Sequence, residues 1–188
     1  MRGYFGIGVE GISKASNLGA VTRTAHAFGA SFIFSVSKSI NLNQVGSVDT
    51  SNATKNMPFY AFDSPEDLLL PKGCKLVGVE LTDEAIELPS FHHPRCAAYI
   101  LGPERGILSS PMLQCCDHIV RIPTKFSINV GLAGALVMYD RLLSMGRFAP
   151  RPQRPGGPTE PMPLPVFGSP AWVRKKTKIP RTIPKNKV

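Results

Sequence analysis

Two stretches of the 188-residue sequence combine a predicted strand end with a tight turn, and such turns can hold a ligand. In residues 99–108, a buried strand runs into the glycine-bounded loop 102–106. In residues 119–145, an apolar strand stops at Pro123, a polar turn follows, and a helix begins with Ser127 as the expected N-cap. Open α/β sheets bind ligands in a crevice at the carboxyl ends of their strands. We therefore expect a binding site where these two turns lie side by side, with backbone N–H and C=O groups facing the ligand.

The helix after the second turn has an unusual composition on its expected buried face. It carries Gly131 and Gly134 among apolar side chains at helical spacing. Each glycine weakens a helix by roughly 1 kcal/mol relative to alanine. This cost predicts that another segment of backbone, or a ligand, comes close to the helix at these positions.

Strands and helices are expected to alternate along the chain, and this alternation has to position the two turns. The sequence predicts strands at residues 2–9, 31–36, 58–62, 74–81, 97–101 and 118–122. It predicts helices at 18–28 with Ser16 or Asn17 as N-cap, at 64–67, at 109–115 and from Ser127 to near Gly146. Residues 37–57 are expected to form a long polar loop, and residues 85–88 either a short helix or an edge segment. The pattern favours an α/β fold with a mostly parallel sheet and helices on both faces.

The excess of positive over negative charge lies entirely in the C-terminal segment of the chain. The formal net charge is +9, but residues 1–146 carry 12 basic and 12 acidic side chains. Residues 147–188 carry ten basic side chains, one acidic side chain and ten of the 18 prolines. A segment of this composition cannot bury enough apolar surface to fold alone. We expect one domain at 1–146, followed at 147–188 by a flexible basic tail that either contacts nucleic acid or serves as a solubilising extension.

Several classes of protein and site are disfavoured. No apolar run reaches the roughly 18 residues needed to span a bilayer, and residues 1–10 read as a strand without a signal-peptide pattern. His92 and His93 are expected in an exposed turn before Pro94, away from any metal cluster. The four cysteines lack zinc-ligand spacing and do not resemble a secreted disulfide framework (Cys74, Cys96, Cys115 and Cys116). We expect a cytoplasmic protein that binds neither a membrane nor a metal.

Three motifs occur in order along residues 1–146. They are Asn17-Leu-Gly-Ala-Val-Thr-Arg-Thr-Ala25, Leu101-Gly-Pro-Glu-Arg-Gly-Ile107 and Ile122-Pro-Thr-Lys-Phe-Ser-Ile-Asn-Val130. Each motif is weak alone, but together, in this order and at this spacing, they resemble those of the SpoU (TrmH-like) RNA ribose methyltransferases of the SPOUT superfamily. The resemblance covers residues 1 to about 146.

The resemblance implies a fold and a reaction that composition could not predict. The fold is an α/β knot, in which the segment 122–145 is threaded through a loop to form a C-terminal trefoil knot. Knots are rare exceptions to the usual rules of topology. The implied assembly is a homodimer, in which the first motif of one subunit faces the cofactor pocket of the other. The implied reaction is methyl transfer from S-adenosyl-L-methionine to a ribose 2′-hydroxyl of tRNA or rRNA.

The resemblance also assigns roles to single residues. Arg23 would anchor the phosphate beside the target ribose and stabilise a developing alkoxide, because arginine stays charged and is a poor base. Asn17 would support it, and Glu104 would organise its loop by accepting hydrogen bonds from backbone or from Asn17. Asn129 completes the predicted catalytic set. The residues expected to contact RNA are Arg23, Lys14 and Lys38. The residues expected to bind the cofactor are Val79, Glu80, Leu81, Leu101, Gly102, Gly106, Ile122, Ser127, Asn129 and Leu132.

Two other functions remain open at this stage. The first is a catalytically silent RNA-binding or ribosome-assembly protein on the same fold, against which the intact polar residues of the three motifs argue. The second is a dinucleotide-binding enzyme, since Gly6-x-Gly8-x-x-Gly11 matches the glycine spacing of a Rossmann fingerprint. That fingerprint requires a helix directly after the glycines. Residues 12–16 intervene here, so we discount the second function.

Overall fold

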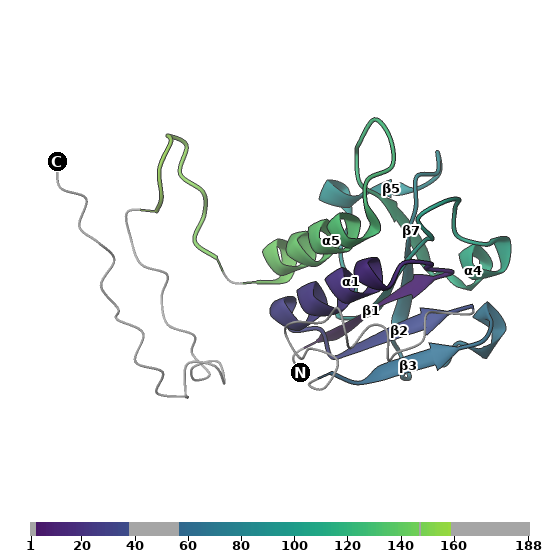
Figure 1. Cartoon of the computed structure of the whole chain (residues 1–188). Coiled ribbons are helices and arrows are strands. Elements are labelled where there is room, and N and C mark those ends of the chain that lie inside the picture. Colours follow the sequence, from purple (N-terminus) through teal and green to yellow (C-terminus); the bar gives the residue numbers. More distant parts are fainter. Residues whose placement is uncertain (1–2, 38–56, 147, 159–188) are drawn as a thin grey trace. The chain divides into compact units, whose positions relative to one another are not determined.

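The structure is a computed structural model that describes residues 3–37, 57–146 and 148–158 (Figure 1). The chain divides into two units, residues 1–146 and 147–188. Almost all of the predicted loop 37–57 and most of the predicted tail lie outside the described residues, as does Lys38. Within the described parts, no helix has the length and apolar character that crossing a membrane requires.

The first unit is built on a parallel sheet, which has seven strands within the described residues. Their order across the sheet is β3-β2-β1-β6-β4-β7-β5, and every neighbouring pair is parallel. The predicted mostly parallel sheet is therefore confirmed. The strands are β1 (Tyr4–Glu10), β2 (Phe32–Val36), β3 (Phe59–Phe62), β4 (Lys75–Val79), β5 (Ile86–Glu87), β6 (Cys96–Leu101) and β7 (His118–Arg121).

Helices cover both faces of this sheet, as the alternating pattern predicts. The two long helices α1 and α5 pack against each other on one face (Figure 1). The short helix α4 and the 3-10 turn η1 contact each other and belong with the core on the opposite face. Their bounds are α1 (Ala15–Phe28), η1 (Pro65–Asp67), α4 (Ser110–Cys115) and α5 (Val130–Met145), and a further 3-10 turn, η2, spans Leu88–Ser90.

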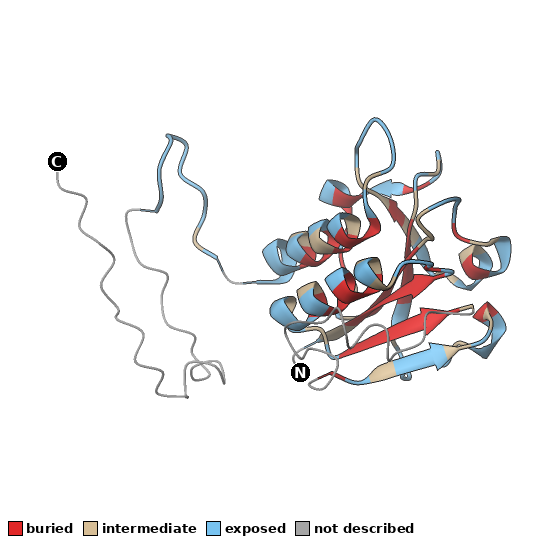
Figure 2. Cartoon of the chain, viewed as in Figure 1, coloured by how far each residue is buried: buried red, intermediate tan, exposed pale blue. Residues whose placement is uncertain are grey.

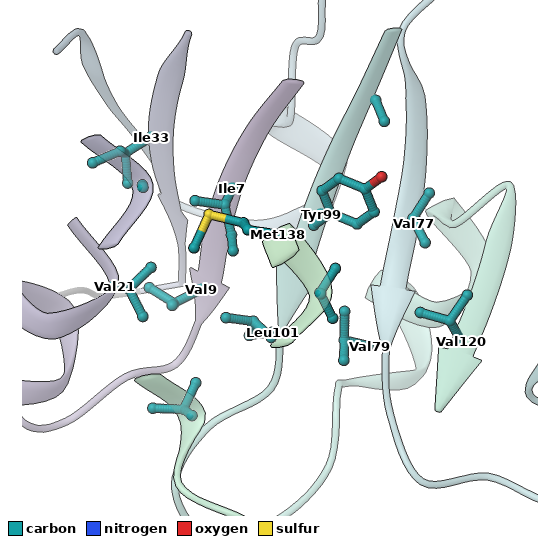
Figure 3. Packing of buried hydrophobic residues seen from close by; sticks show 14 of the residues in the cluster. Ile7, Val9, Val21, Ile33, Val77, Val79, Tyr99, Leu101, Val120 and Met138 are labelled. Atoms are coloured by element: carbon teal, nitrogen blue, oxygen red, sulfur yellow. The ribbon is translucent and has the colours of Figure 1, made fainter. Parts of the chain in front are cut away.

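Alternate residues of the central strands enter two separate apolar cores, because successive side chains of a strand point to opposite faces. Ile7, Tyr99 and Met138 belong to the larger core beneath α1 and α5 (Figure 3). Phe34 and Met112 belong to the smaller core on the other face. Figure 2 shows the resulting burial, in which the central strands of the sheet are coloured as buried. The ends of β1, β4 and β6 are therefore buried, and the loops that follow them begin from packed positions.

Two of the glycines that resemble a dinucleotide fingerprint have a packing role. Gly6 and Gly8 lie within β1 and not in a turn after it. A Cβ atom on Gly6 would lie 2.3 Å from the ring of Phe32, and one on Gly8 would lie 2.5 Å from the ring of Phe34. The two glycines leave room for these neighbouring phenyl rings. The structure therefore argues against the dinucleotide-binding function.

Helix α1 begins at Ala15, three residues before its predicted start. Lys14 is the N-cap and makes no side-chain capping bond, so the prediction of Ser16 or Asn17 as cap is wrong. The carboxylate of Glu104 instead accepts hydrogen bonds from the backbone N–H groups of Ser13 and Lys14, at 3.0 Å each. An anion at this end also complements the helix dipole. A distant residue thus takes over the function of a local cap, which leaves Asn17 available for other bonds.

Helix α5 begins at Val130, and its N-cap is Asn129 rather than the predicted Ser127. The Asn129 Oδ1 atom accepts a 2.8 Å hydrogen bond from the N–H of Gly131. A Cβ atom on Gly131 would lie 3.2 Å from the side chain of Ala20 in α1, so the two helices approach closely there. The close approach predicted from the glycines of this helix is therefore present at Gly131. At Gly134, a Cβ atom would instead lie 3.1 Å from the side chain of Leu101 and 3.3 Å from that of Ile7.

A buried polar network fastens the other half of α5 to the sheet. Arg141 is almost fully buried, and it donates hydrogen bonds to the carbonyl of Pro94 at 2.6 Å and to the hydroxyl of Tyr99 at 3.1 Å. His93 lies between Tyr99 and Asp140, at 2.6 Å and 2.9 Å. The prediction that His93 lies in an exposed turn is wrong, because these partners satisfy both of its ring nitrogens inside the core.

Candidate active site

A cavity of about 410 Å³ opens at the carboxyl ends of β4, β6 and β7, which are neighbours in the sheet. The loops after these strands line it together with the first turns of α1 and α5. All three sequence motifs therefore contribute to one cavity, and the turns after β6 and β7 meet there. The lining residues are Lys14, Asn17, Val79, Glu80, Leu81, Leu101, Gly102, Pro103, Glu104, Gly106, Ile122, Thr124, Ser127, Ile128, Asn129, Val130 and Ala133.

Glu104 joins the second motif to the start of α1. Its Oε1 atom accepts hydrogen bonds from Lys14 N and, at 2.9 Å, from Asn17 Nδ2. Its Oε2 atom accepts bonds from Ser13 N at 3.0 Å and from Ser13 Oγ at 3.1 Å. The contact between Glu104 and Asn17 that the sequence predicts is present. Four donors on one carboxylate hold the loop after β6 against the beginning of α1.

These hydrogen bonds also determine the charge of Glu104. Burial raises its pKa, but donors from the backbone of Ser13, from the side chain of Asn17 and from the backbone of Lys14 outweigh burial and bring the pKa to about 2. Hydrogen bonds to the ionised form of a carboxyl favour that form. Glu104 is therefore a carboxylate at neutral pH and a very weak base. Its chemistry is that of an anchor for the loop and not that of a proton acceptor.

A second hydrogen bond joins the first motif to the third. Asn129 Nδ2 donates to Asn17 Oδ1 at 3.2 Å. The direction of this chain follows from Glu104, because a carboxylate only accepts and the amide nitrogen of Asn17 must face it. The oxygen of Asn17 then faces the amide nitrogen of Asn129, whose own oxygen accepts from Gly131. One polar chain thus fixes the relative positions of all three motifs.

Glu80 supports the opposite wall of the cavity. The strand predicted at 74–81 ends at Val79, so Glu80 and Leu81 leave the sheet and enter the site. Glu80 Oε1 accepts from the N–H of Leu81 at 2.9 Å, and Oε2 accepts from the N–H of Leu108 at 2.8 Å. A Cβ atom on Gly102 would lie 3.1 Å from Glu80 Oε2, so a glycine keeps this wall closely packed. The carboxylate therefore ties the loop after β4 to the loop after β6.

Most of the residues predicted for the site lie together around the cavity. Of the expected cofactor set, Leu132 alone does not line it, because its side chain is 62% exposed on α5 and Val130 and Ala133 face the cavity instead. Lys14, expected to contact RNA, also lines the cavity. Arg23 is exposed on α1 and is not among the residues that line the cavity of its own chain.

Sequence reasoning missed several contributors. Ser13 supplies two of the four donors to Glu104, although it lies outside the first motif. The feature of the sequence that could have indicated Ser13 is its position next to Lys14, in the turn between a predicted strand and a predicted helix. The loops after β6 and β7 also place Pro103, Thr124 and Ile128 at the cavity. These residues were not predicted, because nothing in the sequence marks them as functional. In the part of the chain that the structure describes, no cluster of three or more His, Cys, Asp and Glu side chains could hold a metal ion.

The fold and the cavity define a class of protein: a parallel α/β domain with a small-molecule site at the carboxyl ends of its strands. The family is shown by comparison, since the SpoU rRNA Methylase family model matches residues 5–139, which is more than half of the chain. The chain belongs to this family.

Relatives and solved structures agree with this membership. The chain is 28% identical over 144 residues to an uncharacterized tRNA/rRNA methyltransferase of Archaeoglobus fulgidus, covering 73% of this chain and 63% of the relative. It is 27% identical over 140 residues to the 23S rRNA (guanosine-2′-O-)-methyltransferase RlmB of Nitrosomonas europaea, covering 70% and 53%. An AdoMet-bound rRNA methyltransferase of Sinorhizobium meliloti has the same fold, with a TM-score of 0.69 at 20% identity over 76% of this chain and 57% of that one. The chain thus covers between 53% and 63% of the length of these proteins.

Proposed function

We propose that this protein transfers a methyl group from S-adenosylmethionine to a ribose 2′-hydroxyl of tRNA or rRNA. The observation that carries the proposal is the polar chain from Glu104 through Asn17 to Asn129, which draws the three motifs of the family into one cavity. Two relatives are named as RNA methyltransferases, and a structure of the same fold was solved with AdoMet bound. Membership of the SpoU rRNA Methylase family supports the same reaction.

The cavity fits the proposed cofactor in size and in chemistry. Its volume of about 410 Å³ lies within the roughly 300–1,000 Å³ of sites for small molecules. Its wall combines apolar side chains with backbone polar groups at strand ends, as an adenosine requires. When bound, S-adenosylmethionine supplies an electrophilic methyl group on a sulfonium ion. The residues that would hold it are Val79, Glu80, Leu81, Leu101, Gly102, Gly106, Ile122, Ser127, Asn129, Val130 and Ala133.

The residues of the chain would act by positioning and by charge. Glu104, with a pKa of about 2, is too weak a base to accept the hydroxyl proton. Both oxygens of Glu80 are already engaged by backbone N–H groups. Arg23 would instead hold the phosphate beside the target ribose and stabilise negative charge as it develops on the 2′ oxygen. Lys14, at the cavity wall, would add a second positive charge for the RNA.

The position of Arg23 supports a homodimer as the active form. This side chain lies on α1, six residues after Asn17 and thus about 9 Å further along the helix axis, and it does not line the cavity of its own chain. Helix α5 also exposes a stripe of large apolar side chains at helical spacing, formed by Leu132, Leu136, Tyr139 and Leu143. An exposed apolar stripe of this kind is typical of a protein interface. In the proposed dimer this stripe is covered by a second copy, and Arg23 of each copy faces the cavity of the other.

The order of the strands supports the knot. Val120 of β7 pairs with Val79 of β4 on one side and with Ile86 of β5 on the other. Residues 80–85, which connect β4 to β5, must therefore cross β7 near its carboxyl end. In the proposed knot, the chain that leaves β7 passes through this crossing connection before α5 begins.

Calorimetric titration and a transfer assay test the function together. We expect the purified protein to bind S-adenosylmethionine, and to move radiolabelled methyl groups from it to unmodified tRNA or rRNA. Digestion of the product should place the label on ribose and not on a base. RNA binding without any cofactor binding would replace this proposal with the catalytically silent RNA-binding function.

A further inference from the structure

Three loops at the mouth of the cavity expose large apolar side chains. Leu81 follows β4 and is 41% exposed, Ile107 follows β6 and is 64% exposed, and Phe126 follows β7 and is 75% exposed. These strands are neighbours in the sheet, so the three loops adjoin one another at the same edge. Soluble proteins expose single apolar side chains freely, but a group of them around a cavity marks a binding surface.

Phe126 lies outside the cavity, although residues on both sides of it contribute to the wall. Thr124 and Ser127 line the cavity, whereas Phe126 does not. The turn that carries it is braced by its own hydrogen bonds: Thr124 N donates to the carbonyl of Ile122 at 2.7 Å, and Thr124 Oγ1 donates to the carbonyl of Phe126 at 2.9 Å. The aromatic ring is therefore presented to solvent by a braced turn directly beside the cavity.

Positive charge accompanies this ring. Lys125 precedes Phe126, Arg105 lies in the neighbouring loop with Ile107, and Lys14 lines the cavity itself. Among the described residues, neither Arg105 nor Lys125 forms a salt bridge. Aromatic rings combined with basic side chains are how proteins bind single-stranded nucleic acid, because every base has a face that can stack. The carboxylates of Glu80 and Glu104 in these loops are engaged by N–H groups of the chain, and the exposed acids Asp83 and Glu84 belong to the loop after β4. The charges next to Phe126 in its own loop and beside Ile107 in the loop after β6 are those of Lys125 and Arg105.

We propose that Phe126 stacks on the base of the nucleotide whose ribose enters the cavity, with Ile107 of the neighbouring loop completing an apolar seat. This inference rests on the proposed function and specifies its substrate. A ribose that reaches the cavity leaves its base at the mouth, where Phe126 lies. A base paired in a duplex cannot offer its face to a side chain, so the target nucleotide must be unpaired. The site therefore selects RNA loops or single strands.

Binding of short fluorescein-labelled RNA to the full chain tests this proposal. The probes are a single strand of mixed sequence and the same strand annealed to its complement. For Phe126→Ala we expect the Kd for the single strand to rise roughly fivefold or more, since stacking on an aromatic side chain contributes about 1–3 kcal/mol per base. Binding of the duplex should change little. Phe126→Trp should retain single-strand binding, because it keeps an aromatic face.

Matched controls separate the alternatives. Tyr60 is 52% exposed on β3, at the far edge of the sheet, so Tyr60→Ala should bind both probes as the wild type does. Unchanged single-strand binding by Phe126→Ala would overturn the proposal. So would loss of S-adenosylmethionine binding, which would make Phe126 part of the cofactor site, or a change in oligomeric mass, which would make it a subunit contact. Stacking-dependent RNA binding by a wild type that transfers no methyl group would refute the proposed function, and it would reduce this inference to binding of an unpaired base by Phe126.

Discussion

Replacing Glu104 with glutamine removes a charge while keeping the size of the side chain, and it should loosen the whole site. Each oxygen of Glu104 accepts two hydrogen bonds, from Ser13 N and Oγ on one side and from Lys14 and Asn17 on the other. An amide nitrogen in place of Oε1 would face the two N–H donors of Lys14 and Asn17, and one in place of Oε2 would face the N–H of Ser13. At least one bond is therefore lost in any orientation, and the remaining bonds no longer go to a charged group. Bonds to a charged group contribute about 1.5–3 kcal/mol each. Because the site is partly exposed and water can replace lost partners, we expect Glu104→Gln to lower the free energy of unfolding by about 2 kcal/mol.

Urea unfolding at neutral pH measures this loss, with Glu66→Gln as a matched control on the exposed turn η1. The same variant should bind S-adenosylmethionine more weakly, because the loop after β6 is no longer held against α1. The wild type should also lose part of its stability as pH falls from 4.5 towards 2, since the unfolded carboxyl takes up its proton first. The variant should lack this component. Stability within about 0.5 kcal/mol of the wild type, the scatter of ordinary surface substitutions, would refute the role of Glu104 as an anchor.

Four further outcomes follow from the geometry. Arg23→Ala should abolish nearly all methyl transfer to RNA while calorimetry still detects S-adenosylmethionine binding, and unchanged turnover would remove Arg23 from the mechanism. Gly102→Ala should weaken cofactor binding at least several-fold, because its Cβ would lie 3.1 Å from Glu80 Oε2; an equal Kd would contradict the close packing. Leu136→Lys should turn a dimer into a monomer in light scattering, whereas an unchanged mass would exclude the α5 stripe as the interface. Burial lowers the pKa of His93 below its usual 6.5, so unfolding experiments should find stability falling as pH drops below about 6.5, where the unfolded state binds the proton first; a flat profile from pH 7 to 5 would contradict this.

The sheet and its helices could be predicted from the sequence, because burial on both faces leaves a plain pattern. Apolar strands alternate with helical periodicity, and each predicted strand has a counterpart in the structure. The spacing of Gly6 and Gly8, in contrast, is misleading. Their spacing imitates a nucleotide motif, but it makes room for the phenyl rings of Phe32 and Phe34, which pair with the two glycines from the neighbouring strand β2. Spacing alone could not reveal that contact.

The starts of the helices were less predictable, since long-range contacts override local preference. Ser16, Asn17 and Ser127 are all good caps by residue type. The structure uses Glu104 and Asn129 instead, because the polar chain between the motifs requires Asn17 elsewhere. Leu132 was expected in the cavity from the resemblance alone, whereas the apolar spacing of the helix already placed Val130 and Ala133 on its buried face, and these two residues line the cavity.

The network around Arg141 attaches α5 to the sheet and also fixes the position of the helix along and around its own axis. A helix that slid or rotated by one residue would leave this guanidinium buried without its carbonyl and hydroxyl partners, and an unpaired buried charge costs several kcal/mol. Arg141 lies 12 residues, or about 18 Å along the helix, from Asn129. The network therefore fixes the position of Asn129 at the opposite end of α5, through the contacts of Arg141 with Tyr99 and of Asp140 with His93. Substitutions in this network should alter methyl transfer by misaligning Asn129, although none of these side chains lines the cavity.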